Sequence, residues 1–453
     1  MFRFRVPIYF LILVVLFPFS VFGQSVRIDA VEGRNTAKAN RDRGIRMVKD
    51  IRKVIEENYF DPNFRGIDIK AKFKAAEEEI KTLETNSQIF RVIASLLLEF
   101  NDSHTRFFPP DRANRTEYGF ALQMVGPTCF VVAVKKGSDA EAKGLKVGDV
   151  VTKLGPYPVN RDSLWVLNYM IYHLEPQPAL PVSVIRADGS EERILVQSKV
   201  VPFKDVQKEV AERRKKKRED PYKCAKLSSA VITCRLETFS VDKKFIDRMM
   251  TEVQGHQKFI FDLRGNRGGY VHINQYLTGH FFDREVKTAD MVLRKKTETR
   301  IAKPVKKNQF RGELIVLIDS DSASASEVFS RVMQIEKRGK VVGDVSAGAV
   351  MTSIGFQMMN QRGSYDFMTV SVYGLNVTVA DVIMSDGQRL EHIGVIPDHP
   401  VGPTAQALIE RSDPVLSFAA SLFGHEITPE EAGKLGFLKS KEEDEEDEKD
   451  EDS

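Results

Sequence analysis

Three short runs in the second half of the chain constrain its fold more than any other feature. Residues 258–263, 313–318 and 340–342 are almost continuously apolar. An alternating strand keeps one face in water, whereas a continuous apolar run is typical of a parallel strand that is buried on both faces. An amphipathic segment at residues 325–336 follows the second run, and strands that alternate with helices predict an α/β core. We place this core at residues 225–425.

The first half of the chain shows two other patterns. In residues 35–112 apolar side chains recur at helical spacing, as at Ile51 and Ile55, which predicts an N-terminal helical domain. Residues 115–201 change to short apolar strands separated by glycines, which predicts a second, strand-rich domain. We interpret residues 202–224 as a charged linker, whose basic run is either a solvated helix face or a loop.

The two ends of the chain differ in composition from the rest. Residues 1–23 combine Arg3 and Arg5 with an apolar stretch and then small residues, the pattern of a secretory signal peptide. An uncleaved anchor is the alternative, but a membrane-spanning helix normally needs about 20 apolar residues. We expect cleavage near Gly23, no stable membrane anchor afterwards, and a periplasmic or secreted protein. Residues 439–453 are acidic and lack apolar side chains, which predicts a disordered tail.

The composition narrows the classes of function. The 453 residues carry a formal net charge of +3, and no nucleic-acid-binding motif accompanies the basic segments, so we expect no nucleic-acid partner. The three cysteines, Cys129, Cys224 and Cys234, do not have the spacing of a structural zinc site. Cys224 and Cys234 would close a small disulfide loop in an oxidising compartment, and two buried thiols are the alternative. No metal site and no cofactor are predicted.

Three polar segments carry candidate chemistry. Ser324 lies between a buried run and an amphipathic segment, where amides at the start of a helix can stabilise an oxyanion, although serine is also a common helix cap. Gly268 and Gly269 allow the backbone to approach a bound group closely, although an ordinary tight turn has the same composition. His104 stands in a polar loop, and histidine is the usual general base near neutral pH, although most loop histidines are simply solvated.

Together these segments resemble the C-terminal processing (tail-specific) peptidases and the related tricorn core protease. The shared motifs follow the order of that family: Asp-x-His-Thr at 102–105, Asp-Leu-Arg-x-Asn-x-Gly-Gly at 262–269, Ser-Ala-Ser-Ala-Ser-Glu at 322–327 and Glu-His-Ile-Gly-Val-Ile-Pro-Asp at 391–398. The resemblance implies a crotonase-like α/β protease core, a PDZ domain inserted at residues 115–201, and a serine endopeptidase without a metal or cofactor. It assigns the nucleophile to Ser324.

One departure from the family pattern bears on the mechanism. The bacterial processing branch pairs its serine with a lysine, and Ala349 occupies the place of that lysine here. Alanine cannot take a proton. The tricorn-like branch instead uses a histidine, a serine directly before it and a glutamate, which match His104, Ser103 and Glu391. The resemblance therefore implies an arrangement of serine, histidine, serine and glutamate.

The roles of these groups follow the logic of the serine triad. The imidazole is implied to take the proton of Ser324 during attack and to return it to the leaving amine. The glutamate is implied to hydrogen-bond Ser103, which orients the imidazole. The oxyanion is expected between the amide of Ala325 and that of Gly268 or Gly269.

The resemblance to PDZ domains also implies a mode of substrate binding. Tyr118, Gly119 and Phe120 would form the loop that binds a terminal carboxylate, and a helix at residues 161–173 would form the other wall of the groove. The implied partners are proteins or peptides with accessible C-termini. Two alternatives remain at this point: a catalytically inactive peptide-binding adaptor, and a binder of small apolar ligands.

Overall fold

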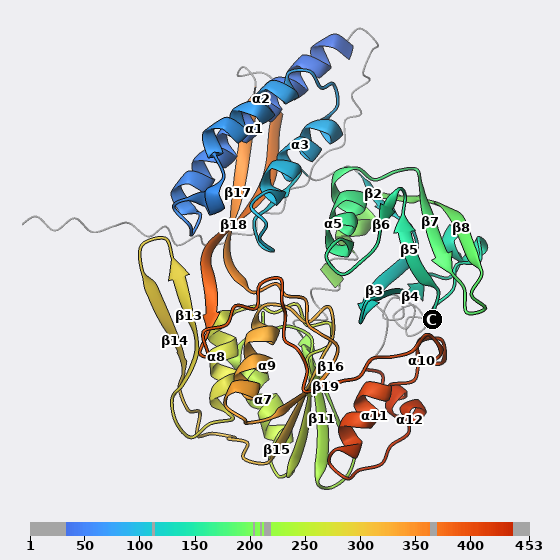
Figure 1. Ribbon diagram of the computed structural model, residues 1–453, viewed down its shortest axis with the longest axis vertical. Helices are drawn as coiled ribbons and strands as arrows, with labels where there is room; N and C mark the ends of the chain where they lie inside the picture. The colour runs from blue at the N-terminus through green and yellow to red at the C-terminus, as the bar shows by residue number, and fades with distance from the viewer. Residues whose placement is uncertain are drawn as a thin grey trace, which may run out of the picture.

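The computed structural model describes residues 33–110, 114–202, 204–208, 211–212, 219–362 and 369–437. The predicted signal peptide and the predicted acidic tail lie outside the described residues. Figure 1 shows a helical part, a smaller sheet-containing domain and an α/β core. Among the helices of the described ranges, none combines the length and the hydrophobicity needed to span a bilayer.

The core is built on a six-stranded sheet in the order β10-β11-β12-β15-β16-β19. Its strands are β10 (Tyr222–Lys226), β11 (Val231–Leu236), β12 (Lys258–Asp262), β15 (Glu313–Ile318), β16 (Lys340–Gly343) and β19 (His399–Pro400). Only the pairing of β10 with β11 is antiparallel. The three apolar runs in the sequence are β12, β15 and β16, so the α/β prediction is confirmed at these strands. Strand β10 begins within the stretch interpreted as a linker.

Helices cover both faces of this sheet, which explains why its central strands β12, β15 and β16 are nearly continuous apolar runs (Figure 1). The bounds are α7 (Lys243–Val253), α8 (Val271–Gly279), α9 (Ala325–Ile335), α10 (Ala405–Glu410), α11 (Pro414–Ser421) and α12 (Pro429–Gly433). Phe259 and Phe261 of β12 pack in one cluster with α7, α8 and α9. Ile260, between them, packs in a second cluster with α11.

A second sheet joins the core to the N-terminal helices. Its strands are β1 (Arg106–Phe108), β13 (Val286–Leu293), β14 (Thr297–Ala302), β17 (Met351–Arg362) and β18 (Thr369–Met384). The helices α1 (Gly33–Asn58), α2 (Ile69–Ile80) and α3 (Asn86–Leu98), with the short η1 (Phe64–Gly66), lie beside the long β17–β18 hairpin (Figure 1). Ile51, Ile93 and Leu375 share one buried cluster across this contact. Because β1 pairs with β18, the loop just before β1 is held against the core.

The second domain spans residues 114–202 and has its own apolar core. Its elements are β2 (Asn114–Glu117), β3 (Phe120–Val125), β4 (Thr128–Val134), α4 (Asp139–Ala142), β5 (Val150–Leu154), β6 (Tyr157–Pro158), α5 (Leu164–Tyr169), η2 (Met170–Leu174), β7 (Ala179–Ile185), β8 (Glu191–Gln197) and β9 (Lys199–Pro202). Strand β3 is at one edge of the main sheet. Strands β2 and β9 pair where the chain enters and leaves the domain.

The prediction of one continuous helix at residues 161–173 is wrong in its start and in its regularity. The helix begins only at Leu164, because Asn160 and Ser163 cap each other in a turn: the amide of each donates to the side-chain oxygen of the other, at 2.9 Å in both directions. It then changes to a π-helical turn, η2, from Met170.

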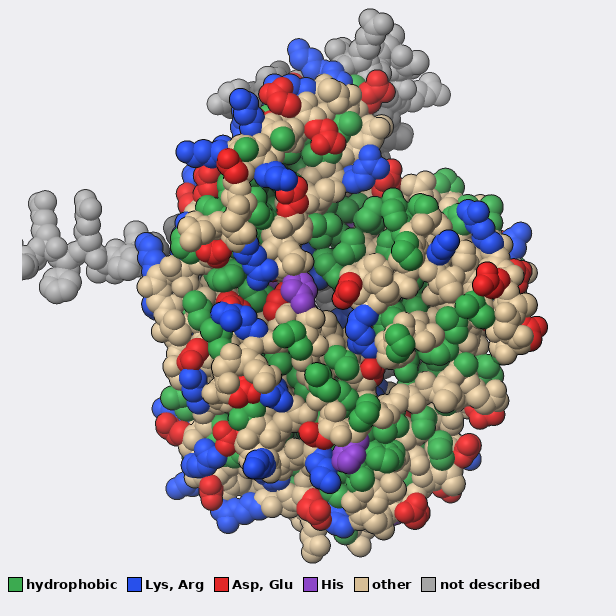
Figure 2. Space-filling model, in the orientation of Figure 1, with side chains coloured by type: hydrophobic (Ala, Val, Ile, Leu, Met, Phe, Trp, Pro, Cys, Tyr) green, Lys and Arg blue, Asp and Glu red, His purple; other side chains and the backbone are tan. Residues whose placement is uncertain are grey.

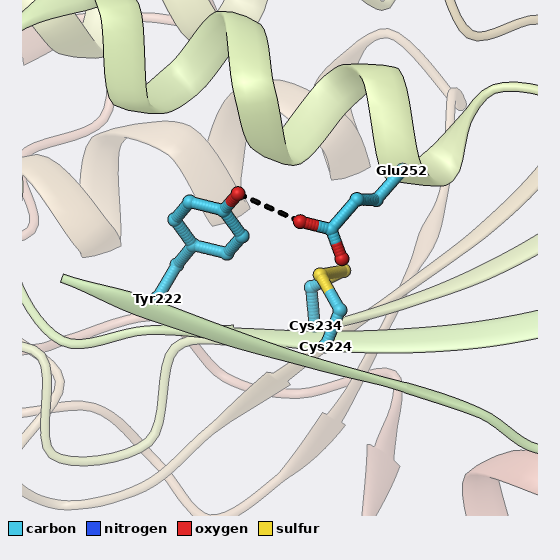
Figure 3. The surroundings of a disulfide bond; sticks show 4 residues. All are labelled: Tyr222, Cys224, Cys234 and Glu252. Atoms are coloured by element: carbon cyan, nitrogen blue, oxygen red, sulfur yellow. Dashed lines mark hydrogen bonds between the residues drawn. A yellow bond between two sulfur atoms is a disulfide. The ribbon is translucent and has the colours of Figure 1, made fainter. Parts of the chain in front are cut away.

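The structure contains one of the two cysteine arrangements that the sequence left open. Cys224 and Cys234 lie opposite each other on β10 and β11 and form a disulfide with an S–S distance of 2.03 Å (Figure 3). Beside it, the Tyr222 hydroxyl donates to Glu252 Oε1 at 2.7 Å. Cys129 is a buried free thiol in the second domain.

Candidate active site

Ser324 occupies a sharp turn between β15 and α9. Its φ is +56° and its ψ is −114°, a left-handed backbone that is uncommon for a residue with a side chain. Gly268 packs directly against this turn, because a Cβ built on it would lie 2.8 Å from Ser324 Cβ and 2.9 Å from the Ala325 nitrogen. The glycine turn therefore supports the position of Ser324 by close backbone approach.

The neighbouring serines of this segment are engaged in structural hydrogen bonds. Ser320, Ser322 and Ser326 donate to the main-chain carbonyls of Met124, Leu263 and Asn266 at 2.6, 2.8 and 2.7 Å. The hydroxyl of Ser324 donates to no group in the part of the chain that the structure describes, and Ser324 lines a pocket. Among these serines, Ser324 is therefore the one whose hydroxyl is available for chemistry.

The two glycines predicted as alternative oxyanion donors differ in what their amides do. The Gly268 amide donates to Asn266 Oδ1 at 2.9 Å and is engaged. The amides of Gly269 and Ala325 have no acceptor within the described ranges, and both residues line the same pocket as Ser324. The available pair of donors beside Ser324 is thus Ala325 and Gly269, while Gly268 contributes shape.

Ser103, His104 and Glu391 form a continuous hydrogen-bonded line. Glu391 Oε2 accepts the Ser103 hydroxyl at 2.9 Å, and Glu391 Oε1 accepts the Ser103 amide at 2.6 Å. Ser103 Oγ lies 2.6 Å from His104 Nδ1. A hydroxyl has one proton, so a Ser103 that donates to the carboxylate accepts a hydrogen bond from the Nδ1–H of His104. This tautomer leaves His104 Nε2 with the lone pair that a general base needs.

The histidine loop is fixed by Asp102, a residue whose role the sequence reasoning missed. Its carboxylate accepts the amides of His104 and Thr105 at 3.0 and 2.6 Å, and the Thr105 hydroxyl at 2.9 Å. It also accepts the hydroxyls of Tyr59 at 3.0 Å and of Thr378 at 2.7 Å. The signal was present in the Asp-x-His-Thr motif, since an aspartate two residues before a histidine can cap the turn that carries it.

A second buried carboxylate, Glu327, holds the nucleophile turn and was also missed. Its Oε2 accepts the Ser324 amide at 2.8 Å and the Ala349 amide at 3.0 Å. Its Oε1 accepts the Ser346 hydroxyl at 2.6 Å and the Gly348 amide at 2.8 Å. Ala349, at the position where the bacterial processing peptidases have their lysine, therefore belongs to a segment that is held by hydrogen bonds to Glu327, three residues after Ser324.

The segment around Ala349 connects the two halves of the site. The Ser324 amide donates to the Ala349 carbonyl at 3.1 Å. The amide of the next residue, Val350, donates to Glu391 Oε2 at 2.8 Å. In the described residues no direct hydrogen bond joins the Ser324 hydroxyl to the His104 imidazole, and catalytic hydrogen bonds are often long before substrate binds.

Burial sets the protonation of the site. Burial, with a smaller contribution from the positive charge of Arg106 and against the negative charge of Asp102, lowers the pKa of His104 to about 4, so the imidazole is neutral at pH 7. Burial raises the pKa of Glu391, and hydrogen bonds from Ser103 and Val350 oppose this effect. Burial also raises the pKa of Glu327 to about 7, against the hydrogen bonds that it accepts.

The pocket beside Ser324 is mainly apolar. Its volume is about 450 Å³, counted with its open mouth, and Val271, Met291, Val328 and Val382 line it. Such a pocket suits an apolar side chain placed next to the serine. Within the described ranges, no group of three or more His, Cys, Asp or Glu side chains is arranged as metal ligands.

The predicted carboxylate-binding loop lies in the second domain, apart from Ser324. Gly119 has a φ of +72°, and a Cβ on it would lie 2.4 Å from Ser138 Cβ, so this position requires glycine. Tyr118 is buried and its hydroxyl donates to the Gln177 carbonyl at 2.8 Å. Phe120 is buried at the start of the edge strand β3.

Comparison with known sequences identifies relatives of the core. Residues 230–401 match the sequence profile of peptidase family S41. A chloroplastic C-terminal processing peptidase of Tetradesmus obliquus is 25% identical over 379 residues, which cover 78% of this chain and 76% of the relative. A probable CtpA-like serine protease of Staphylococcus aureus is 22% identical over 268 residues. That match covers 56% of this chain and 50% of the relative, so it spans about half the length of the staphylococcal protein.

Comparison with solved structures extends the likeness to most of the chain. Mature CPAF complexed with lactacystin has a TM-score of 0.61 at 13% identity, and the match covers 88% of this chain and 99% of that one. A structure of mature CPAF has a TM-score of 0.60 at 13% identity, covering 82% of this chain and 94% of that one. At such low identity the likeness shows a shared fold alone.

Proposed function

We propose that this chain, a serine-type peptidase whose residues 230–401 match family S41, is a secreted or periplasmic endopeptidase directed to C-terminal or unfolded segments of proteins. The observation that carries the proposal is the chain of hydrogen bonds from Glu391 through Ser103 to His104. The peptide group between Ala349 and Val350 connects it to the nucleophile turn, because the Val350 amide donates to Glu391 and the Ala349 carbonyl accepts the Ser324 amide.

The proposed mechanism requires the His104 imidazole and the Ser324 hydroxyl to come within hydrogen-bond distance when substrate binds. His104 Nε2 takes the proton of Ser324 as the hydroxyl attacks the scissile carbonyl, and returns it to the leaving amine. Ser103 and Glu391 hold the tautomer and stabilise the imidazolium that forms. The free amides of Ala325 and Gly269 receive the oxyanion. In this mechanism His104 performs the proton transfer, so the absence of a lysine at position 349 does not prevent catalysis.

We propose that the second domain is a PDZ domain that captures the substrate. Strand β3 has a sheet neighbour on one side only, so a peptide can add to it as a further strand. The far end of β3 contacts the loop before Ser324: Gln123 Nε2 donates to Asp319 at 2.8 Å, and Met124 accepts the Ser320 hydroxyl. Figure 2 shows the surface hollowed between this domain and the rest of the molecule. A tethered chain would reach Ser324 at high effective concentration.

The proposed location rests on two independent features. The N-terminal sequence pattern is that of a secretory signal. The Cys224–Cys234 disulfide is of a kind that persists in oxidising compartments and is rare in the cytosol.

The test compares two peptides that end in the same apolar sequence, one with a free carboxylate and one amidated. We expect wild-type protein to cleave both and to have the lower KM for the free carboxylate. Ser324→Ala should reduce kcat by about 10⁴-fold or more while binding persists. Binding without any cleavage by wild-type protein would favour an inactive adaptor, and saturable uptake of an apolar small molecule with neither would favour a ligand binder.

A further inference from the structure

Within the described residues, the side chain of Arg106 is a cation that has neither an ion pair with an acid nor a hydrogen bond. It follows His104 by two residues and begins β1. The side chain is half-buried. Its Nε is fully enclosed and has no hydrogen-bond partner, whereas its two Nη nitrogens are not fully enclosed. Within the described ranges the guanidinium lies over the ring of Trp165 in α5, 4.4 Å from Cζ to the ring centroid.

The charged neighbours of Arg106 are already engaged. Asp102 and Glu391 act on it electrostatically, but both carboxylates are occupied by the hydrogen bonds of the histidine loop. The nearby cation Arg267 has its own acid, Asp321, at 2.7 Å. Burial lowers the pKa of the Arg106 guanidinium, and the opposing effects of Tyr169, Asp102 and Glu391 offset this desolvation only in part.

A cation in this setting needs an explanation, because desolvating a charge is unfavourable unless an anion compensates it. A cation–π contact alone is a weak compensation. The open Nη pair forms the planar fork that binds a carboxylate through two parallel hydrogen bonds. Carboxylates are also the anions that unmodified polypeptides carry.

Arg106 lies where the second domain contacts the strand that follows the histidine loop. Trp165 belongs to α5, the wall of the proposed peptide groove, and Tyr169 of the same helix donates its hydroxyl to the Phe107 carbonyl. Strand β1 therefore lies against α5, with Arg106 between the peptide-binding domain and His104. Arg106 thus contacts the wall of the proposed groove and stands two residues after His104.

We propose that Arg106 determines specificity by binding a carboxylate of the peptide substrate, either its C-terminal carboxylate or an Asp or Glu side chain. This inference rests on the proposed peptidase function and adds a chemical preference to it. The stacked face of Trp165 holds the fork in one orientation.

The experiment measures kcat/KM for matched peptides. One pair differs only in a free or amidated C-terminus, and a second set, with amidated termini, exchanges Gln for Glu at each position flanking the scissile bond. We expect wild-type protein to prefer at least one carboxylate peptide by about tenfold or more. A preference confined to the free terminus identifies the chain end as the ligand, and one confined to Glu identifies a side chain.

Variants assign the preference to Arg106. In Arg106→Met, which keeps an apolar chain against Trp165, the ratio of kcat/KM between carboxylate and neutral peptides should fall to about one. Arg106→Lys should give an intermediate ratio and serves if the methionine variant does not fold. Arg267→Gln, which removes a neighbouring cation that already has a partner, should keep the wild-type ratio. Equal cleavage of all peptides by wild-type protein, or a ratio unchanged in both Arg106 variants, would overturn the inference, whereas no cleavage of any peptide would overturn the peptidase function itself.

Discussion

Replacement of Ser103 by alanine tests the least conventional part of the proposed mechanism. Within the described residues, the Ser103 hydroxyl is the only group that links Glu391 to His104. Ser103→Ala removes that link but keeps the Ser103 amide, which still donates to Glu391, and Glu391 keeps the amide of Val350. The loop should therefore stay in place while the imidazole loses the partner of its Nδ1.

The size of the effect follows from that single lost contact. A hydrogen bond to a charged group contributes about 1.5–3 kcal/mol. Because about 1.4 kcal/mol corresponds to a factor of ten in rate, kcat should fall by about 10- to 150-fold. KM should change little, since Ser103 lies behind the imidazole. The loss should remain well below the roughly 10⁴-fold expected for removal of the nucleophile.

The assay is steady-state cleavage of an unfolded reporter peptide at pH 7, with far-UV circular dichroism to verify folding. Ser103→Thr is the matched control, because it keeps a hydroxyl at the same position and should retain most of the wild-type kcat. An unchanged kcat in Ser103→Ala would refute the argument. So would an equal loss in the alanine and threonine variants, because the hydroxyl would then have no specific part.

Three further predictions concern other parts of the account. Glu391→Gln should lower kcat less than His104→Ala, because an orienting group contributes less than the base it orients; steady-state kinetics that give the reverse order would contradict these roles. The pKa of His104 is about 4 in the folded protein and near 6.5 when unfolded, so the native state binds fewer protons between these values and the unfolding free energy falls as pH drops from about 6.5 to 4. Urea denaturation at pH 7 and pH 5 should show a smaller loss in His104→Asn, and an equal loss would refute this assignment. Joint replacement of Cys224 and Cys234, ten residues apart, by serine should lower the unfolding free energy by about 3 kcal/mol with little change in kcat, and unaltered stability would count against the disulfide.

The buried sheet was the most predictable part of the fold. Strands β12, β15 and β16 are covered on both faces, and their sequences are therefore continuous apolar runs that can be recognised without a structure. The long β17–β18 hairpin had no such signal, because β17 exposes side chains such as Ile354 and Met359 while its partner strand packs on the helices. Its existence depends on contacts with the N-terminal helices, which are distant in sequence.

The candidate site could be read from the sequence only through its motifs. Ser103, beside His104, reaches Glu391 because β1 pairs with β18, a contact between segments more than two hundred positions apart that no local pattern encodes. The choice between Gly268 and Gly269 was open for a similar reason: it depends on where the Asn266 side chain points. Trp165 against Arg106 is likewise a contact between two domains, and neither residue carries a motif that marks it.

Covalent labelling with an organophosphonate probe tests the central claim most directly, since the probe reacts with a serine that a neighbouring base has activated. Wild-type protein should carry a single adduct, which peptide mass spectrometry locates at Ser324, and His104→Ala should lose it while remaining folded. An adduct on another serine, or labelling of Ser324 that persists at the wild-type rate without His104, would contradict the account.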